Sequence, residues 1–344
     1  MRSLHICHSF DYGGITTFVR SLVQLNDGCD SDHDLLIWKK SISGLPLNTT
    51  VIDISKSARR ESEFRKAISV YDKLFIHSLH PFMLQSLRNK RQQAYLFQHG
   101  LTTGDKFPWS FFKKVMYLYA IHALKIRVIC SSEFAYRKLR SRINFIWKRN
   151  ILIIPFGIDI NNHIIISHSQ RKEGYFVLGA AGHLVKQKRF ANILTALSGI
   201  NNKTRIKLKI AGKGPLEGEL RSMADGLLKQ GVEVNFLGEV FEMQSFYDSL
   251  DLFIMPSKHE SFGLVVLEAL SRKVPVIVYA DSGTCVDFIV PGINGYVVRD
   301  NRELSDKIME LENIENYNRL KSKIRDYESG NYSILNTRYA LNNI

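Results

Sequence analysis

The chain has 344 residues, which is comfortable for two domains, and its 45% hydrophobic and 23% charged residues are typical of a folded rather than a disordered protein. The four cysteines are far apart and form no Cys-x-x-Cys pair, so the sequence favours a reducing compartment over a zinc site or a disulfide framework. The net charge is +14, and residues 1–160 carry 24 Lys and Arg against 12 Asp and Glu, a balance that suits an anionic membrane, a phosphorylated acceptor or nucleic acid.

The start of the chain, Met1–His8, is too short and too polar for a signal peptide. No uninterrupted apolar run is long enough to cross a bilayer. We therefore expect a cytoplasmic protein that is not integral to a membrane.

Apolar strands alternate with helical stretches in two series. The first series comprises Leu4–Cys7, Asp34–Trp38, Thr50–Ile54, Lys73–His77, Ala94–Gln98 and Arg127–Cys130. The second comprises Tyr175–Ala181, Lys207–Ala211, Glu233–Leu237, Leu252–Met255, Val274–Tyr279 and Gly295–Val298. Strands interleaved with helices predict parallel sheets, so the fold class is α/β with two doubly wound, Rossmann-like domains. The polar stretch Asn161–Gly174 separates the series and predicts domains at 1–165 and 166–320, followed by a helix and tail at 321–344.

Two short motifs follow strands of the first series. Gly13 and Gly14 lie between the first strand and the first helix, where paired glycines allow the backbone to approach a ligand closely. This loop lacks a Gly-x-Gly-x-x-Gly fingerprint, which argues against NAD. His99 directly follows a strand; a lone histidine more often packs or lies on the surface, but this placement makes it a catalytic candidate. His77 and His80 are weaker candidates.

The segment Phe107–Ala120 is both aromatic and basic. One interpretation is a peripheral membrane surface, with aromatic rings at the interface and lysines on anionic headgroups. The other is a core helix with two exposed lysines, because aromatic residues are also ordinary core material.

The segment Gly182–Phe190 follows a strand, opens a helix and contains Lys188, a cation suited to phosphate. Farther along, Glu260-Ser261-Phe262-Gly263-Leu264 and Glu268 lie in a strand, loop and helix unit. With Glu260 in the loop and Glu268 one to two turns into the helix, both acids can flank one ligand. Backbone N–H groups near Gly263 would then bind phosphate oxygens at a helix N-terminus.

The Glu260-x7-Glu268 arrangement resembles the signature of the retaining glycosyltransferase family 4, which has the GT-B fold of two Rossmann-like domains facing a central cleft. Further runs match in order, namely Ile154–Asp159, Ile210–Leu216 and Phe236–Val240. The resemblance implies that the last helix packs back on the first domain.

The resemblance also implies roles for the site residues. Glu260 would lie beside the donor sugar, Glu268 would bind the ribose, and Lys188 would bind the diphosphate together with the helix start. Gly13 and Gly14 would border the donor phosphates, Gly238 would lie in the segment that lines the base pocket, and His99 would reach the donor sugar or the acceptor. His183 stands where the family usually has an arginine, and Lys186 or Arg189 are candidates to compensate.

We therefore expect a retaining glycosyltransferase that moves a hexose from a UDP- or GDP-linked sugar to a hydroxyl of a saccharide or polyprenyl-diphosphate-linked acceptor, as in lipopolysaccharide or other cell-surface polysaccharide synthesis. The basic first half predicts peripheral contact with anionic lipids on the inner face of the membrane. Neither a metal nor a cofactor is expected, because Lys188 and the helix start carry the charge of the leaving group, and we interpret Asp30-Ser31-Asp32 as a solvated loop.

Two alternatives stay open. A nucleotide-sugar epimerase on the same fold would use the same donor, because a fold does not determine the chemistry. A non-enzymatic basic protein would bind nucleic acid, but no helix-turn-helix, zinc-finger or aromatic RNA-binding motif supports that partner.

Overall fold

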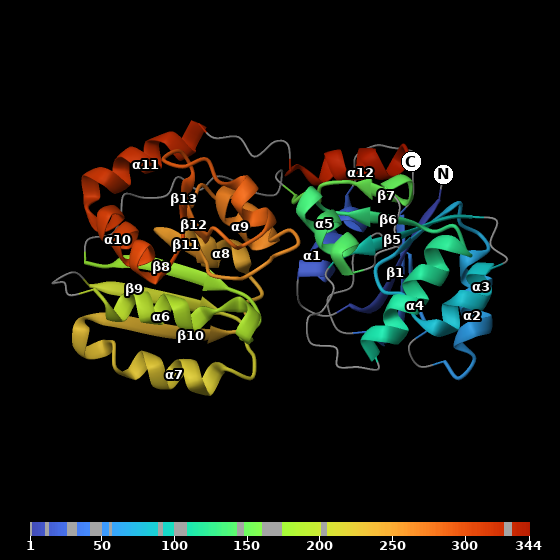
Figure 1. The fold of residues 1–344 in the computed structure, drawn as a ribbon, viewed down its shortest axis with the longest axis horizontal. Coiled ribbons are helices and arrows are strands. Elements are labelled where there is room, and N and C mark those ends of the chain that lie inside the picture. Colours follow the sequence, from blue (N-terminus) through green and yellow to red (C-terminus); the bar gives the residue numbers. More distant parts are fainter. Residues whose placement is uncertain are drawn as a thin grey trace. The chain divides into compact units, whose positions relative to one another are not determined.

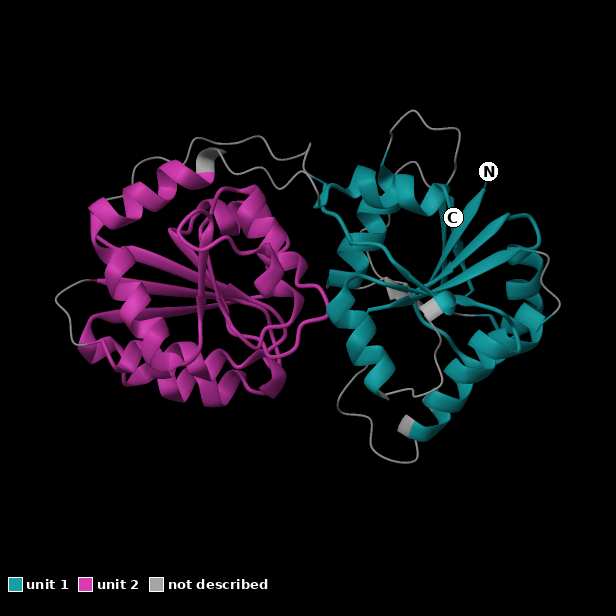
Figure 2. Ribbon diagram, turned by 45° about the horizontal axis from the view of Figure 1, so that its top comes forward, with its two compact units in different colours: residues 1–159, 331–344 teal, residues 160–330 magenta. Residues whose placement is uncertain are grey.

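The computed structural model forms two compact units (Figures 1 and 2). Unit 1 comprises residues 1–159 and 331–344, and unit 2 comprises residues 160–330. The structure describes residues 2–10, 14–25, 33–41, 50–54, 57–88, 92–99, 109–142, 148–159, 174–200, 205–326 and 332–344. Gly13, the Asp30-Ser31-Asp32 loop and the predicted boundary at residue 165 lie outside these ranges. Residue 320, the predicted end of the second domain, falls inside a helix that continues to Asp326.

The sheet of unit 1 is parallel and has the strand order β3-β2-β1-β4-β5-β6-β7. Its strands are β1 (Ser3–Phe10), β2 (His33–Ser41), β3 (Val51–Asp53), β4 (Lys73–Ile76), β5 (Gln93–Gln98), β6 (Arg127–Cys130) and β7 (Ile151–Ile153). The order reverses between β1 and β4, which are neighbours in the sheet. Doubly wound sheets bind ligands beside such a reversal, at the carboxyl ends of the strands.

The helices of unit 1 are α1 (Gly14–Gln24), α2 (Arg60–Ile68), α3 (Pro81–Arg88), α4 (Trp109–His122), α5 (Glu133–Arg142) and α12 (Ile334–Asn342). Apolar side chains of α2, α3 and α4 pack with those of the strands in one buried cluster, which includes Phe64, Leu87 and Ala120. Among the described residues, no helix has both the length and the apolarity that a membrane crossing requires.

The last helix, α12, is fastened to unit 1 by main-chain and side-chain bonds. Ile158 N donates to Tyr332 O at 2.9 Å, and Ile334 N donates to Ile158 O at 2.8 Å. At the other end of α12, the buried Lys73 Nζ donates to the carbonyl oxygens of Leu341 and Asn342 at 3.1 and 2.8 Å. The helix is therefore held at both ends, and a lysine lies where the helix dipole is negative.

The sheet of unit 2 is also parallel and has the order β10-β9-β8-β11-β12-β13. Its strands are β8 (Phe176–Ala181), β9 (Ile206–Ala211), β10 (Val232–Gly238), β11 (Leu252–Met255), β12 (Val276–Tyr279) and β13 (Gly295–Val298). The order reverses between β8 and β11, so both units have the same doubly wound connection. The predicted α/β fold with two Rossmann-like domains is confirmed.

The helices of unit 2 are α6 (Phe190–Ser198), α7 (Glu217–Asp225), α8 (Met243–Asp248), α9 (Leu264–Ser271), α10 (Asn301–Glu312) and α11 (Ile314–Asp326), with a 3-10 helix η2 (Lys186–Lys188) before α6. One buried cluster joins the sheet to α6, α7, α10 and α11, whereas α9 contacts β11 and β12 and packs on α8 (Figure 1). The prediction for β12 was wrong at its start. The strand begins at Val276 because Lys273 has a positive φ of 58° and Val274 N still donates to Ala269 O in α9.

Candidate functional site

The candidate site of unit 2 lies where the loops that follow β8 and β11 meet. Lys188, at the end of η2, places its Nζ 2.6 Å from Oε1 of Glu260 in the loop after β11. The two side chains are 24% and 15% exposed, so the ion pair is largely but not fully withdrawn from water. A carboxylate and a cation that are far apart in the sequence are thus adjacent at the strand reversal.

The backbone of Glu260 is fixed by the loop that follows β12. Glu260 N donates to Ser282 O at 3.0 Å, Thr284 N donates to Glu260 O at 3.2 Å, and Glu260 forms a parallel bridge with Gly283. The neighbouring Ser261 O accepts a hydrogen bond from Thr284 Oγ1 at 2.8 Å. The carboxylate therefore projects from a backbone that is anchored on both sides.

Gly263 ends this loop and precedes the first residue of α9, Leu264. Its φ is +89°, a left-handed conformation that glycine adopts without steric cost. A Cβ at this position would overlap the sulfur of the buried Cys285 and would lie 4.0 Å from the Cβ of Glu260. The start of α9 is therefore close to Glu260, as the sequence interpretation requires. The side chain of Phe262 is buried against Phe288, so any contact of this residue with a ligand would come from its main chain.

Glu268 lies one turn into α9 and faces α8. Its Oε2 accepts a hydrogen bond from the hydroxyl of Tyr247 at 2.7 Å. Burial raises the pKa of Glu268, and the Tyr247 bond acts in the opposite direction. The carboxylate is thus held in one orientation by an aromatic residue that the sequence analysis did not identify, because nothing in the spacing links residue 247 to residue 268.

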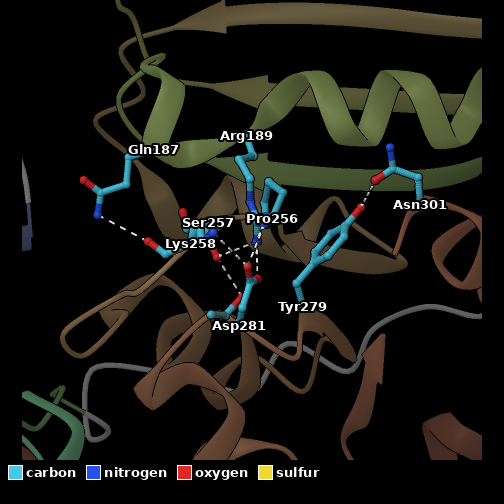
Figure 3. Close-up of polar contacts among 9 residues, drawn as sticks. Gln187, Arg189, Pro256, Ser257, Lys258, Tyr279, Asp281 and Asn301 are labelled. Atoms are coloured by element: carbon cyan, nitrogen blue, oxygen red, sulfur yellow. Dashed lines mark hydrogen bonds and ion pairs between the residues drawn. The ribbon is translucent and has the colours of Figure 1, made fainter. Parts of the chain in front are cut away.

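Arg189 is a structural residue at this edge of the sheet (Figure 3). Its guanidinium donates to both carboxylate oxygens of Asp281, at 2.5 and 3.0 Å, and to the carbonyl oxygen of Pro256 at 2.7 Å. It also lies over the ring of Tyr279, 5.0 Å from the centroid. These contacts tie the loops after β8, β11 and β12 together, so Arg189 is already engaged and is a poor candidate to bind phosphate in place of position 183. His183 itself is exposed.

Gly238 belongs to the same edge of the sheet. It has a φ of +66° and ends β10, where its carbonyl oxygen accepts a hydrogen bond from Gly212 N at 2.6 Å. Gly212 in turn touches Gly182, because a Cβ on Gly212 would overlap the carbonyl oxygen of Gly182. Three glycines therefore link the ends of β10, β9 and β8.

The predicted residues of unit 1 that the structure describes are Gly14 and His99. Gly14 is exposed at the first position of α1, and Gly13 is outside the described residues. His99 follows β5, and its Nε2 lies 2.7 Å from Nδ1 of His77, which follows β4. His77 Nε2 lies 2.9 Å from Nδ1 of His5 in β1. Burial lowers the pKa of His99 to about 3 and holds the pKa values of His5 and His77 well below 6.5.

Comparison with known proteins gives a family match for unit 2. Residues 162–327 match the family model described as glycosyl transferases group 1, which covers all but the ends of this unit. The capsular polysaccharide biosynthesis glycosyltransferase CapM of Staphylococcus aureus is 28% identical over 196 residues, which are 56% of this chain and 51% of that protein.

A GDP-mannose-dependent alpha-(1-6)-phosphatidylinositol dimannoside mannosyltransferase of Mycobacterium tuberculosis is 27% identical over 180 residues, 46% of this chain and 45% of that protein. The chain spans about half the length of the curated relatives that it matches.

Solved structures match over the whole chain. A glycosyltransferase from Rickettsia africae ESF-5 has a TM-score of 0.76 and 15% identity, covering 99% of this chain and 97% of that one. Anabaena Alr3699/HepE, solved in complex with UDP and glucose, has a TM-score of 0.76 and 14% identity, covering 99% and 98%. WaaG, a glycosyltransferase involved in lipopolysaccharide biosynthesis, has a TM-score of 0.74 and 14% identity, covering 99% of each chain. The chain therefore has the GT-B fold.

The contact between Gly263 and Cys285 gives a test of how the site is built. Gly263→Ala is expected to lower the free energy of unfolding by about 3 kcal/mol, of which about 1 kcal/mol comes from the positive φ and the rest from overlap with the sulfur. In the double variant Gly263→Ala with Cys285→Ala the sulfur is gone, and the atom nearest to the new Cβ at position 263 is the Cβ of residue 285 at 3.8 Å. The double variant should therefore be more stable by at least about 1 kcal/mol than the sum of the two single changes predicts, as measured by urea denaturation. Gly218→Ala in α7, where a Cβ meets nothing within 4 Å, is the control and should not destabilise. An additive double mutant would contradict this geometry.

The buried histidines predict acid sensitivity. His5 and His77 stay neutral in the folded protein, because burial lowers their pKa values, whereas the unfolded chain protonates both below about pH 6.5. The unfolded state then binds more protons, so stability should fall by about 1 kcal/mol per histidine between pH 7 and pH 5.5. In urea titrations across this range, His77→Gln should lower the slope of stability against pH by up to about 1.4 kcal/mol per pH unit. The exposed His122, changed to Gln, is the control; equal slopes in all three proteins would refute the prediction.

Proposed function

We propose that this chain is a metal-independent, retaining glycosyltransferase that moves a hexose from a UDP- or GDP-linked sugar to a hydroxyl of a saccharide or polyprenyl-diphosphate-linked acceptor in cell-surface polysaccharide synthesis. The observation that carries the proposal is the ion pair of Lys188 and Glu260 beside the start of α9, at the strand reversal of a unit that matches group 1 glycosyl transferases. The functions of the capsule and lipopolysaccharide relatives support the class of acceptor.

The ion pair has the polarity that the reaction needs. When the bond between the sugar and the phosphate breaks, negative charge builds up on the departing diphosphate and positive charge on the sugar ring. Lys188 Nζ has three hydrogens to donate to phosphate oxygens, and the N-terminus of α9 beyond Gly263 adds main-chain donors. Glu260 orients the sugar and stabilises its developing positive charge. One cation and one carboxylate, 2.6 Å apart, thus match the two charges that separate.

The remaining residues orient the nucleotide. Glu268, fixed by Tyr247, accepts hydrogen bonds from the ribose hydroxyls. Gly238, with its positive φ, lies in the segment that would line the base pocket. The leaving phosphate accepts the proton of the acceptor hydroxyl, so the reaction needs no separate protein base.

Nucleotide binding tests the donor half of this proposal. UDP or GDP should raise the melting temperature, because a ligand at 100 times its Kd adds about 2.7 kcal/mol to stability. Glu268→Gln should weaken that binding at least about tenfold through loss of charge-assisted hydrogen bonds, and Lys188→Met should weaken it further. Glu219→Gln, an exposed change in α7, is the control and should keep the full shift. The shifts of the melting temperature with ADP and CDP, compared with those for UDP and GDP, show which base the site prefers.

Absence of any nucleotide-dependent shift would overturn the proposed donor site, and so would full shifts in both site variants. Consumption of the donor sugar without an acceptor, with formation of an epimer, would replace transfer by epimerisation. Product anomers resolved by NMR report directly on retention.

We infer that unit 1 contacts the inner face of the membrane through the start of α4. Phe111 and Phe112 are 55% and 60% exposed, and Val115 and Tyr119 continue the same helix face at 47% and 39%. The exposed Lys114 adds a charge for anionic headgroups, within a half of the chain that carries an excess of 12 positive charges. The core-helix interpretation holds only for the later turns, where Ala120 and Ile121 are buried.

Vesicle flotation tests the membrane contact. The protein should float with vesicles that contain anionic phosphatidylglycerol at low salt and should not float with purely zwitterionic vesicles. The double variant Phe111→Ser and Phe112→Ser should reduce binding at least about tenfold, because two aromatic side chains leave the interface. Tyr339→Ser on α12 removes an aromatic ring that is 74% exposed and is the control. Equal flotation of both variants would remove this surface from the proposal.

A further inference from the structure

Four histidines form a continuous hydrogen-bonded chain across unit 1. His33, His5, His77 and His99 come from or directly follow β2, β1, β4 and β5, which is the order of these strands in the sheet. Consecutive ring nitrogens are 2.9, 2.9 and 2.7 Å apart. Each of the two middle imidazoles uses both of its nitrogens within the chain, whereas a metal-binding imidazole reserves one nitrogen for the metal.

The hydrogen-bonded series of histidines begins at α12. Oδ1 of Asn342, at the end of this helix, lies 3.0 Å from Nε2 of His33. A carbonyl oxygen can only accept a hydrogen bond, so Nε2 of His33 carries a hydrogen. In a neutral imidazole the other nitrogen is then an acceptor. His5 must therefore donate to His33 from its Nε2, and the same reasoning passes along the chain through His77 to His99.

A count of protons gives the same result. Four neutral imidazoles carry four ring hydrogens in all, and the four hydrogen bonds from Asn342 to His99 each need one. No ring hydrogen remains for Nδ1 of His99. The outermost imidazole therefore holds a lone pair on Nδ1 and a hydrogen on Nε2.

The surroundings favour neutral rings. His5 and His33 are 0% and 4% exposed, and Phe75 stacks on His5 at 5.0 Å between centroids. Phe97 stacks on His77 at 4.4 Å and on His99 at 5.6 Å. Both ring nitrogens of His5 and of His77 contact other imidazoles, so a charge on either of these two rings would lose its hydration and face another imidazole instead of a carboxylate. The nearest carboxylate on β2, Asp34, is already bound to Arg2 and to the hydroxyl of Tyr71.

We propose that Asn342, His33, His5 and His77 act as positioning residues that fix His99 as the Nε2–H tautomer, so that its Nδ1 accepts a hydrogen bond from a sugar hydroxyl at the carboxyl edge of the sheet. The hydroxyl half of this inference rests on the proposed function; the tautomer half does not. The helix α12, held by Lys73 and by the bridge of Ile158 with Ser333, contacts His33 on β2 and thereby sets the hydrogen-bonding character of His99 after β5, three strands farther along the sheet.

Nitrogen-15 NMR of the full chain with labelled histidine tests the tautomer directly. In the unsubstituted protein at pH 7, Nδ1 of His99 should have the chemical shift of an unprotonated nitrogen and Nε2 that of a protonated one. Asn342→Leu removes the acceptor that sets the direction, so the two shifts should move toward an average. Asn343→Leu, at the neighbouring exposed position, is the matched control and should leave them unchanged. A protonated Nδ1 in the unsubstituted protein would overturn the proposal even if Asn342→Leu fails to fold.

Kinetics tests the hydroxyl half. With a donor sugar and acceptor, Asn342→Leu should lower kcat/KM about fivefold, as for the loss of one neutral hydrogen bond, while Asn343→Leu keeps full activity. Asn342→Gln retains a neutral carbonyl acceptor and should keep the Nδ1 signal unprotonated and restore most of the activity. A displaced tautomer with unchanged kcat/KM would refute the role of Nδ1 in substrate binding. Failure of the nucleotide-binding experiment would instead refute the proposed function and leave the tautomer assignment standing.

Discussion

The ion pair between Lys188 and Glu260 is the constraint on which the candidate donor site depends. Each partner is largely withdrawn from water, so each would pay a desolvation cost alone that the other offsets. The pair therefore adds one contact between the loops after β8 and β11 and holds its own two side chains side by side. In the proposed reaction, the same two side chains would stabilise the charges that develop when the bond between sugar and phosphate breaks.

A second set of contacts keeps these two side chains available for a ligand. Gln187 and Arg189, which flank Lys188, both bind the loop after β11, through Lys258 O and through Pro256 O respectively. Arg189 also forms the paired contact with Asp281, whose pKa is lowered by the guanidinium. Because Gln187 and Arg189 bind this loop independently of Lys188, the proposed exchange of Glu260 for phosphate at Lys188 would leave these loop contacts in place. Lys188 and Arg189 are adjacent in the sequence but have different contacts, and only the folded structure shows which of the two holds the loops together.

The sequence predicted the layout of the fold well, and the reason is physical. Strands β6, β11 and β13 were predicted with both ends correct, because their apolar runs are bounded by polar residues or by proline and glycine. Strand β7 was missed, since three residues before Pro155 give too short a pattern. The side-chain contacts of the site could not be predicted from the sequence. Arg189 takes a positive φ of 48°, and neither its turn nor its pairing with a residue 92 positions away leaves a local signal.

The histidines of unit 1 are a second example of contacts that the sequence alone does not reveal. His99 was a candidate because it follows a strand, whereas His5 and His33 carried no signal, because a histidine within a strand more often packs than acts. Only the sheet order reveals that four strands each bring one imidazole to a single line. The two units thus share one strand topology but place different side chains at the strand reversal, charged ones in unit 2 and uncharged ones in unit 1. At its strand reversal unit 2 presents a charged pair, which suits a diphosphate and a sugar cation. Unit 1 presents neutral imidazoles in an apolar layer, which suit an uncharged hydroxyl whose recognition depends on which nitrogen holds the proton.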